Sequence, residues 1–194
     1  MQTTSTNTVN AYDFDHTIYR GDASFDFIIF SLLRHPALLR YLPLHAWAIF
    51  LYVIGKKNRK QIKQVAFSFL KDINDIDDEL QHFWVKHEHK VEEWYLKQKK
   101  SSDIVISASP EFLLQPIVSK LGIETLIGTK MNKTTGVITG ENCRAEEKVS
   151  RLTKAKLNVE ILNAYSDSMS DLPLLNLAKN AYIVRKSVVR KLEK

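Results

Sequence analysis

The sequence lacks the features that mark a secreted or membrane-spanning protein. Cys143 is its single cysteine, so no disulfide can form within the chain, which is typical of proteins from a reducing compartment. The first ten residues, MQTTSTNTVN, have neither the basic start nor the apolar run of a signal peptide. Internal repeats and low-complexity segments are also absent from the sequence. We therefore expect a cytoplasmic globular protein.

No apolar run in the sequence is long enough to cross a bilayer. The most apolar stretch, residues 36–55, is interrupted by Arg40, Pro43 and His45, and its uninterrupted part, residues 46–54, spans only nine positions. A transmembrane helix needs about 20 residues to cross a hydrocarbon layer of about 30 Å. We interpret the stretch as a buried helix of a helical cap, with an interfacial helix on a membrane as the alternative.

The overall composition is that of an ordinary globular chain with a basic surface. Its 194 residues, 44% hydrophobic and 26% charged, can bury a core and still accommodate an inserted domain. The formal net charge of +6 suits anionic partners, which include nucleic acid, an anionic membrane face and phosphorylated small molecules. Charge alone does not choose among these three classes.

The order of the predicted elements indicates an α/β core with a helical insertion. Residues 8–13 read as a strand, and the segment that follows, up to residue 100, contains helical patterns only. From residue 103 onward, strands alternate with helices, which is typical of a parallel sheet covered by helices. The fold class that we predict is α/β, with a doubly wound, mainly parallel, Rossmann-like sheet in residues 1–19 and 101–194. Residues 20–100 should form an all-helical cap.

Periodicity and turn residues delimit the individual elements. The helical patterns cover residues 25–34, 61–71, 75–100, 110–121, 144–155 and 172–179, with Asp22 or Ser24 as the N-cap of the first and Gly122 as the stop of the fourth. Short strands are expected at residues 103–106, 124–128, 159–165 and 181–184, together with a small β-hairpin at 133–140 and a basic tail from residue 185 onward.

An acidic pair, Asp13 and Asp15, stands at the end of the first predicted strand. In an extended chain, residues i and i+2 project to the same side, roughly 7 Å apart, so both carboxylates can face one small group. Ligands of open α/β sheets bind outside the carboxyl ends of the strands. Ser107 and the pair Ser166-Asp167 also follow predicted strands, and Lys148 lies early in the helix after the hairpin. These residues should therefore share one site.

The residue types at this edge suit phosphoryl transfer. Asp13 can attack phosphorus to give an aspartyl-phosphate, and Asp15 can protonate the leaving alkoxide and later activate water. Ser107 and the backbone N–H of Ala108 can donate hydrogen bonds to phosphoryl oxygens, and Lys148 can supply a positive charge. Together with Asp167, the two aspartates make an oxygen-rich pocket suited to magnesium, which would offset the repulsion between carboxylate and phosphate.

Each of these features has a structural explanation when it is taken alone. Paired aspartates at a strand end are more often a solvated turn, and the sequence Ser-Ala-Ser-Pro is usually a helix cap. A lysine after two glutamates is usually surface charge, and Asp167 or Asp171 can serve as the N-cap of the helix that follows. What favours a site is their joint placement at the ends of neighbouring strands.

Four stretches resemble the motifs of the haloacid dehalogenase superfamily, in its phosphoserine phosphatase-like branch (subfamily IB). Asp13-Phe14-Asp15-His16-Thr17 resembles the first motif, D-x-D-x-T, and Val105-Ile106-Ser107 the second. Lys148 corresponds to the third, and Ser166-Asp167-Ser168-Met169-Ser170-Asp171 to the acidic fourth. The resemblance covers nearly the whole chain, and it implies a doubly wound core with a helical cap inserted after the first motif.

The same resemblance assigns roles to individual residues. Asp13 is the nucleophile and Asp15 the acid/base, while Ser107 and Lys148 contact the phosphate and the nucleophile. Magnesium is held by the Asp13 carboxylate, the Asp15 backbone carbonyl and Asp167, with Asp171 close behind. The dehalogenase members lack the second aspartate, so Asp15 favours phosphate chemistry. Two departures stand out: His16 replaces the usual Gly or Ser, and the fourth motif lacks the glycines and asparagine of G-D-G-x-N-D.

The sequence says less about the substrate. We predict a magnesium-dependent phosphatase that hydrolyses a phosphomonoester of a small metabolite, with His16 and Arg20 as the nearest basic groups that can contact it. Residues 34–60, 165–168 and 173–175 are also similar to bacterial phosphatidylglycerophosphate phosphatases. That similarity implies a lipid phosphatase as the alternative, with the apolar stretch and the basic run 56–60 resting on an anionic membrane surface.

A protein without catalytic activity, which binds nucleic acid or another anion, is a further alternative. Basic runs at residues 97–100 and 185–194 motivate it. They lack the interleaved aromatic and glycine residues of common RNA-binding modules, and such runs are usually solvated. We therefore expect no nucleic-acid partner.

Overall fold

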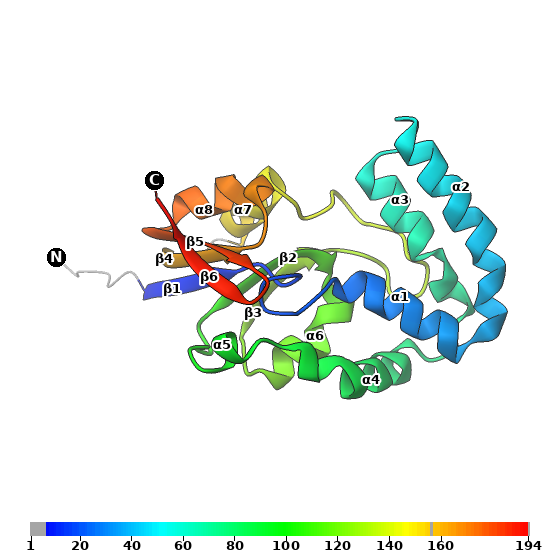
Figure 1. The fold of residues 1–194 in the computed structure, drawn as a ribbon, viewed down its shortest axis with the longest axis horizontal. Coiled ribbons are helices and arrows are strands. Elements are labelled where there is room, and N and C mark those ends of the chain that lie inside the picture. The colour runs from blue at the N-terminus through cyan, green and yellow to red at the C-terminus, as the bar shows by residue number, and fades with distance from the viewer. Residues whose placement is uncertain (1–6, 156, 194) are drawn as a thin grey trace.

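The computed structural model describes residues 7–155 and 157–193, and within them six strands form one sheet in the order β3-β2-β1-β4-β5-β6 (Figure 1). The strands are β1 (Asn7–Tyr12), β2 (Ile104–Pro110), β3 (Thr125–Thr129), β4 (Val159–Ser166), β5 (Asn180–Arg185) and β6 (Val188–Leu192). The first five strands pair in parallel, and β6 pairs antiparallel with β5. The predicted fold class is confirmed. Residues 1–6, 156 and 194 of the expected core lie outside the described residues.

Helices cover both faces of the sheet, as a doubly wound fold requires. On one face lie α6 (Glu111–Lys120) and α4 (Ile76–His87), and on the other lie α7 (Glu146–Lys154) and α8 (Leu172–Leu177) (Figure 1). The side chains of a strand alternate between the two faces. In β2, Val105 accordingly belongs to the apolar cluster under α6, whereas Ile104 and Ile106 belong to the cluster under α7 and α8.

The chain between β1 and β2 is helical and divides into two parts. Helices α1 (Ala23–Arg34), α4 and the short α5 (Glu93–Leu96) stay close to the sheet, whereas α2 (Leu42–Val53) and α3 (Arg59–Ala66) project from it as an antiparallel pair (Figure 1). Asp22 caps α1 by accepting a hydrogen bond from the Phe25 N–H, which confirms the predicted helix start. The first helix thus begins directly beside the acidic pair.

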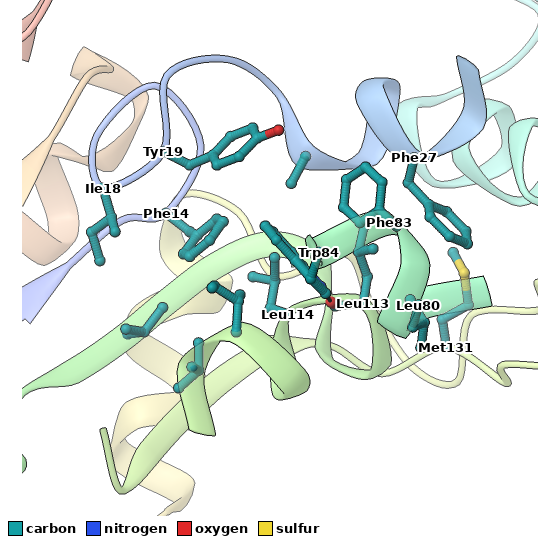
Figure 2. Close-up of a cluster of buried hydrophobic side chains, with 14 of the residues drawn as sticks. Phe14, Ile18, Tyr19, Phe27, Leu80, Phe83, Trp84, Leu113, Leu114 and Met131 are labelled. Atoms are coloured by element: carbon teal, nitrogen blue, oxygen red, sulfur yellow. Dashed lines mark hydrogen bonds between the residues drawn. The ribbon is translucent and has the colours of Figure 1, made fainter. Parts of the chain in front are cut away.

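One aromatic cluster joins the helical insertion to the sheet (Figure 2). Trp84 of α4 packs edge-on against Phe14, which separates the two aspartates, with ring centroids 6.0 Å apart. Its indole N–H donates to the carbonyl of Leu113 in α6 at 2.7 Å, so a buried polar group is satisfied. Phe83, next along α4, contacts Phe27 of α1 at 5.3 Å. The packing of Phe14 against Trp84 therefore holds the loop that carries the acidic pair against α4.

A second aromatic row fixes the neighbouring strands at the same level. Tyr12, Tyr165 and Tyr182 are register partners on β1, β4 and β5, and their rings stack at centroid distances of 4.6 and 4.7 Å. Such same-face neighbours stabilise the pairing of adjacent strands. Because Tyr12 directly precedes Asp13, the stacked rings fix the position of Asp13 at the carboxyl end of β1.

The prediction of a buried helix in residues 36–55 is wrong. The stretch forms a 3₁₀ turn (Pro36–Tyr41) followed by α2, and Ala48 is the buried residue of α2. The helix packs along α3 at the edge of the molecule, so most of its apolar side chains face outward. No single helix among the described residues is long and apolar enough to cross a membrane. The pair Ala23–Arg34 and Pro36–Val53, bent by 119°, passes the same test of length and composition when it is taken together.

Two further predictions of secondary structure are corrected. Residues 75–100 are not one helix, because the backbone turns out of α4 at a 3₁₀ turn and Val91 forms an isolated bridge with Tyr19. Residues 133–140 are not a regular hairpin either, although Met131 and Ile138 form a single bridge. The side chain of Asn132 accepts the backbone N–H groups of the next turn instead.

The predicted basic tail is the sixth strand of the sheet. The backbone reverses at Lys186 and Ser187, with φ values of 48° and 65°, and β6 then runs back along β5. Positive φ at both central residues is the geometry of a tight hairpin turn. The basic side chains of this segment therefore lie on an ordered edge strand of the sheet.

Candidate active site

Asp13 is the first residue after β1, and the sheet continues to hold its backbone. Its N–H donates to the carbonyl of Tyr165 on β4 at 2.9 Å. Its side chain is buried, and the carboxylate oxygen Oδ1 accepts from the Phe14 N–H at 2.8 Å and contacts Lys148 Nζ at 2.9 Å. Burial raises the pKa of Asp13 to about 7, against the lowering effect of Lys148. Both contacts orient the second oxygen, Oδ2.

Lys148 lies in the first turn of α7 and has a side chain that is only 1% exposed. Its ammonium group bridges two carboxylates, Asp13 at 2.9 Å and Asp171 Oδ2 at 2.6 Å. Burial alone would lower the pKa of Lys148, but the two carboxylates outweigh it and hold the pKa above its usual value. A permanent positive charge is thus placed against the candidate nucleophile.

Asp15 is held by the start of α1 and by the end of β2. Its Oδ1 accepts from the Ala23 N–H at 2.7 Å, and its Oδ2 accepts from the Ser109 hydroxyl at 2.6 Å and from the Ser107 hydroxyl at 3.3 Å. Burial, followed by the negative charge of Asp22, raises the pKa of Asp15. A raised pKa favours the protonated form of the carboxyl group, which is the form that an acid catalyst needs.

The acidic fourth stretch follows β4, and it forms the part of the cavity wall that lies beyond this strand. Asp171 is buried and accepts hydrogen bonds from Ser166 at 2.8 Å and from Lys148. Burial raises the pKa of Asp167, which the nearby His16 lowers and Asp171 raises. Asp171 is therefore tied to the lysine, while Asp167 faces His16.

A cavity of about 170 Å³ brings most of the predicted site residues together. It is lined by Asp13, Asp15, His16, Asp22, Ala108, Arg144, Lys148, Asp167, Ser168, Ser170 and Asp171. Ser107, in contrast, is fully buried behind Asp15. Arg20 lies outside the cavity, and its guanidinium donates to the His89 carbonyl at 2.9 Å. It lines an adjoining groove of about 1110 Å³ that shares His16 and Asp167 with the cavity.

His16 occupies a backbone position that favours glycine. Its φ of 56° lies in the left-handed region, where a side chain is strained and glycine is not. The His16 N–H donates to the carbonyl of Gly21 at 2.9 Å, which closes the loop after the first aspartate. This geometry explains why a glycine is common at the corresponding position of the motif, and it puts the imidazole at the mouth of the cavity.

Three further residues contact the cavity or the groups that form it, although the sequence did not predict a role for them: Lys63, Arg144 and Ser109. Lys63 of α3 reaches from the insertion to the Ala108 carbonyl at 2.7 Å, and burial lowers its pKa. Arg144, four positions before Lys148, lines the cavity and donates to Ser170 at 3.2 Å. Ser109 holds Asp15 at shorter distance than the predicted Ser107. Arg144 precedes the start of α7, and Lys63 resembles any surface lysine on a helix, so no local pattern in the sequence marks either residue.

The acidic side chains of the cavity fit a hard divalent cation by their chemistry. Asp13, Asp15, Asp167 and Asp171 all line it, and carboxylate oxygens are the ligands that magnesium prefers. Burial raises the pKa of both Asp13 and Asp167, and a cation in the cavity would counter that effect by favouring their ionised forms. Within residues 7–155 and 157–193, no three acidic, histidine or cysteine side chains already form a metal cluster.

Comparison with known sequences decides the family. Residues 11–176, which include both aspartates, Lys148 and the acidic fourth stretch, match the sequence model of the haloacid dehalogenase-like hydrolases. The chain belongs to this family. It is similar to the protein CicA of Caulobacter vibrioides, with 28% identity over 193 residues, covering 87% of this chain and 82% of the relative.

Solved structures share the fold of this haloacid dehalogenase-like hydrolase at low sequence identity. A protein of unknown function from Bordetella pertussis is 20% identical, with a TM-score of 0.74, over 91% of this chain and 89% of that one. Phosphoserine phosphatase with bound substrate is 18% identical, with a TM-score of 0.60, over 91% of this chain and 85% of that one. The predicted family and the phosphoserine phosphatase-like fold are confirmed.

Proposed function

We propose that this hydrolase is a phosphatase that cleaves phosphomonoesters through an aspartyl-phosphate. The observation that carries the proposal is the buried contact between Asp13 and Lys148, with Asp15 beside it at the wall of the same cavity. A nucleophilic carboxylate, a fixed cation and a carboxyl group of raised pKa are the groups that stepwise phosphoryl transfer needs. We further propose that helices α1 to α5 act as the cap, with Lys63 contacting the carbonyl of Ala108 at the cavity wall.

The geometry supports a two-step reaction. Lys148 and the Phe14 N–H hold Asp13 Oδ1, which orients Oδ2 toward phosphorus; the new O–P bond forms as the bond to the alkoxide breaks. The proton of Asp15 passes to the alkoxide oxygen, which leaves as the alcohol. Asp15, now ionised, takes a proton from the water that attacks the aspartyl-phosphate, and inorganic phosphate is released. Lys148 and Arg144 stabilise the negative charge of the phosphoryl oxygens in both steps.

The reaction should depend on a divalent cation. Magnesium, held by Asp13, Asp167, the backbone of Asp15 and the neighbouring Asp171, would neutralise phosphoryl charge. We expect EDTA to lower the turnover of p-nitrophenyl phosphate at least about 100-fold, and excess magnesium to restore it. Full activity after exhaustive chelation and gel filtration would contradict the metal assignment. Calcium, which is larger and less strict in geometry, serves as the matched control and should restore little activity.

Small phosphorylated metabolites are the first candidate substrates, because the cavity of about 170 Å³ suits a phosphoryl group with a compact substituent. A lipid phosphate is the second candidate. The adjoining groove favours it, since Met169, Ile183 and Val188 give it apolar walls beside basic residues. We expect phosphate release from at least one class in a panel of phosphorylated metabolites and micellar lipid phosphates. Release from no member of either class would overturn the proposed function.

A further inference from the structure

Helix α2 carries an apolar surface that the fold leaves uncovered. Its sequence, LPLHAWAIFLYV, contains no Asp, Glu, Lys or Arg, and its two titratable side chains are His45 and Tyr52. Four large side chains on it are at least half exposed: Trp47 (58%), Ile49 (54%), Phe50 (50%) and Val53 (76%). Leu42, Leu44 and Ile54 add exposed area at its two ends. We call these seven residues the α2 face.

The α2 face is continuous and points away from the rest of the molecule. Ala48 is buried on the side of α2 that packs along α3, and the exposed residues occupy the remaining arc of the helix. The rings of Trp47 and Phe50 stack at 5.3 Å, so they form one surface. In Figure 1 the helix forms the outer edge of the projecting pair, far from the sheet. Contiguous apolar patches of this kind mark interaction sites.

The charges within the segment that carries the α2 face are all of one sign, and two of them, Arg40 and Lys60, pair with Asp72 and Glu141 from outside it. No Asp or Glu occurs in residues 27–71, a segment that contains eight basic residues: Arg34, Arg40, Lys56, Lys57, Arg59, Lys60, Lys63 and Lys71. Four of them follow α2 directly, and of these Lys56 and Arg59 are exposed. An apolar helix with a basic border is the composition that binds an anionic membrane interface.

We propose that the α2 face docks on the surface of a bilayer that contains anionic lipids. The helix has 12 residues and a length of about 18 Å, against a hydrocarbon thickness of about 30 Å, so it lies in the interface. Its partner in the bent pair, α1, keeps Phe27 in the protein core, which anchors the pair to the fold. Trp47 sits at the level where amphipathic rings prefer to lie.

A second copy of this chain fits the α2 face less well. Two-fold pairing places the same patch on both sides of the contact. The basic border of one copy would then face the basic border of the other, and the carboxylates that contact this border, Asp72 and Glu141, already pair with Arg40 and Lys60. A surface of anionic headgroups supplies both the apolar layer and the opposite charge.

The test is binding of the whole protein to vesicles of defined composition. We expect co-flotation with vesicles of phosphatidylcholine and phosphatidylglycerol at about 50 mM salt, and at least tenfold weaker binding at about 500 mM. Pure phosphatidylcholine vesicles should bind at least tenfold less protein. Of the three tryptophans, Trp47 is the exposed one, whereas Trp84 is buried and Trp94 is partly buried. The emission should therefore shift to the blue on binding, and Trp47→Phe should remove the shift.

Substitutions on the α2 face separate docking from general stickiness. Phe50→Ser combined with Val53→Ser should weaken binding to anionic vesicles at least tenfold, and Lys56→Gln about fivefold. Val85→Asn is the matched control, because Val85 is 71% exposed on α4 and should leave binding unchanged. All three variants should turn over p-nitrophenyl phosphate at the wild-type rate, which keeps this test independent of the proposed function.

Three outcomes would overturn the proposal. One is absence of binding to anionic vesicles at low salt by a protein whose circular dichroism spectrum is native. Another is binding that the Phe50/Val53 double variant leaves intact. The third is a wild-type dimer in analytical ultracentrifugation, without vesicles, that the same double variant converts to a monomer, since a second copy would then cover the face.

Discussion

Replacing Asp13 by Asn should lower the turnover of p-nitrophenyl phosphate by about four to six orders of magnitude, as removal of a catalytic nucleophile does elsewhere. The amide keeps the shape of the side chain and can still accept from the Phe14 N–H, but its oxygen cannot form a stable ester with phosphorus. The rest of the cavity, including Lys148 and Asp15, stays in place. A discontinuous assay of released p-nitrophenol over many hours gives the sensitivity that this range requires.

The matched control for this variant is Asp103→Asn. Asp103 is also a buried aspartate, and it lies at the start of β2, where it accepts hydrogen bonds from Asn10 and the Lys100 N–H. Its position is at the opposite end of the strand from the cavity, so its variant should keep activity within about twofold. Thermal melts of both variants show that each is folded. Turnover by Asp13→Asn above a hundredth of the wild-type rate would remove Asp13 from the role of nucleophile.

The sequence predicted the positions of the acidic residues because strand ends carry a strong signal. Buried parallel strands are short apolar runs, and the first polar residue after each run lies at the carboxyl edge of the sheet. Asp13 and Asp167 lie at such strand ends and line the cavity, whereas Ser107, the first polar residue of β2, is buried behind Asp15. The sequence also predicted that Lys148 lies early in a helix, and it does lie in the first turn of α7. The hairpin predicted before that helix does not form.

Other features could not be predicted because they depend on contacts between distant segments. The burial of an apolar helix depends on the elements that pack against it, and its own sequence does not show how many there are. In the structure α3 packs against one side of α2, and the other side stays exposed. Lys63 reaches the Ala108 carbonyl because α3 lies against the end of β2, a relation that no local pattern contains. Gly136 marks another such contact, since a Cβ there would come within 2.3 Å of the Phe67 carbonyl oxygen.

The second large effect is expected at Lys148. Its replacement by Met keeps the length of the side chain but leaves Asp13 and Asp171 without their shared cation in a buried site. Breaking a buried ion pair by removing one partner costs about 3–5 kcal/mol. We therefore expect Lys148→Met to lose that much unfolding free energy in urea titrations, and to lower turnover at least about 1000-fold. Lys154→Met, an exposed position on the same helix, should change stability by less than about 0.5 kcal/mol.

A double variant identifies the origin of the lost stability. If the cost arises from carboxylates left without a counter-charge, adding Asp171→Asn to Lys148→Met removes one of them and should recover about 1–3 kcal/mol. Activity should not return, because Asp13 still lacks the positive charge beside it. If the double variant is as unstable as Lys148→Met, the loss comes from packing of the lysine stem. The charge of Lys148 would then serve catalysis alone.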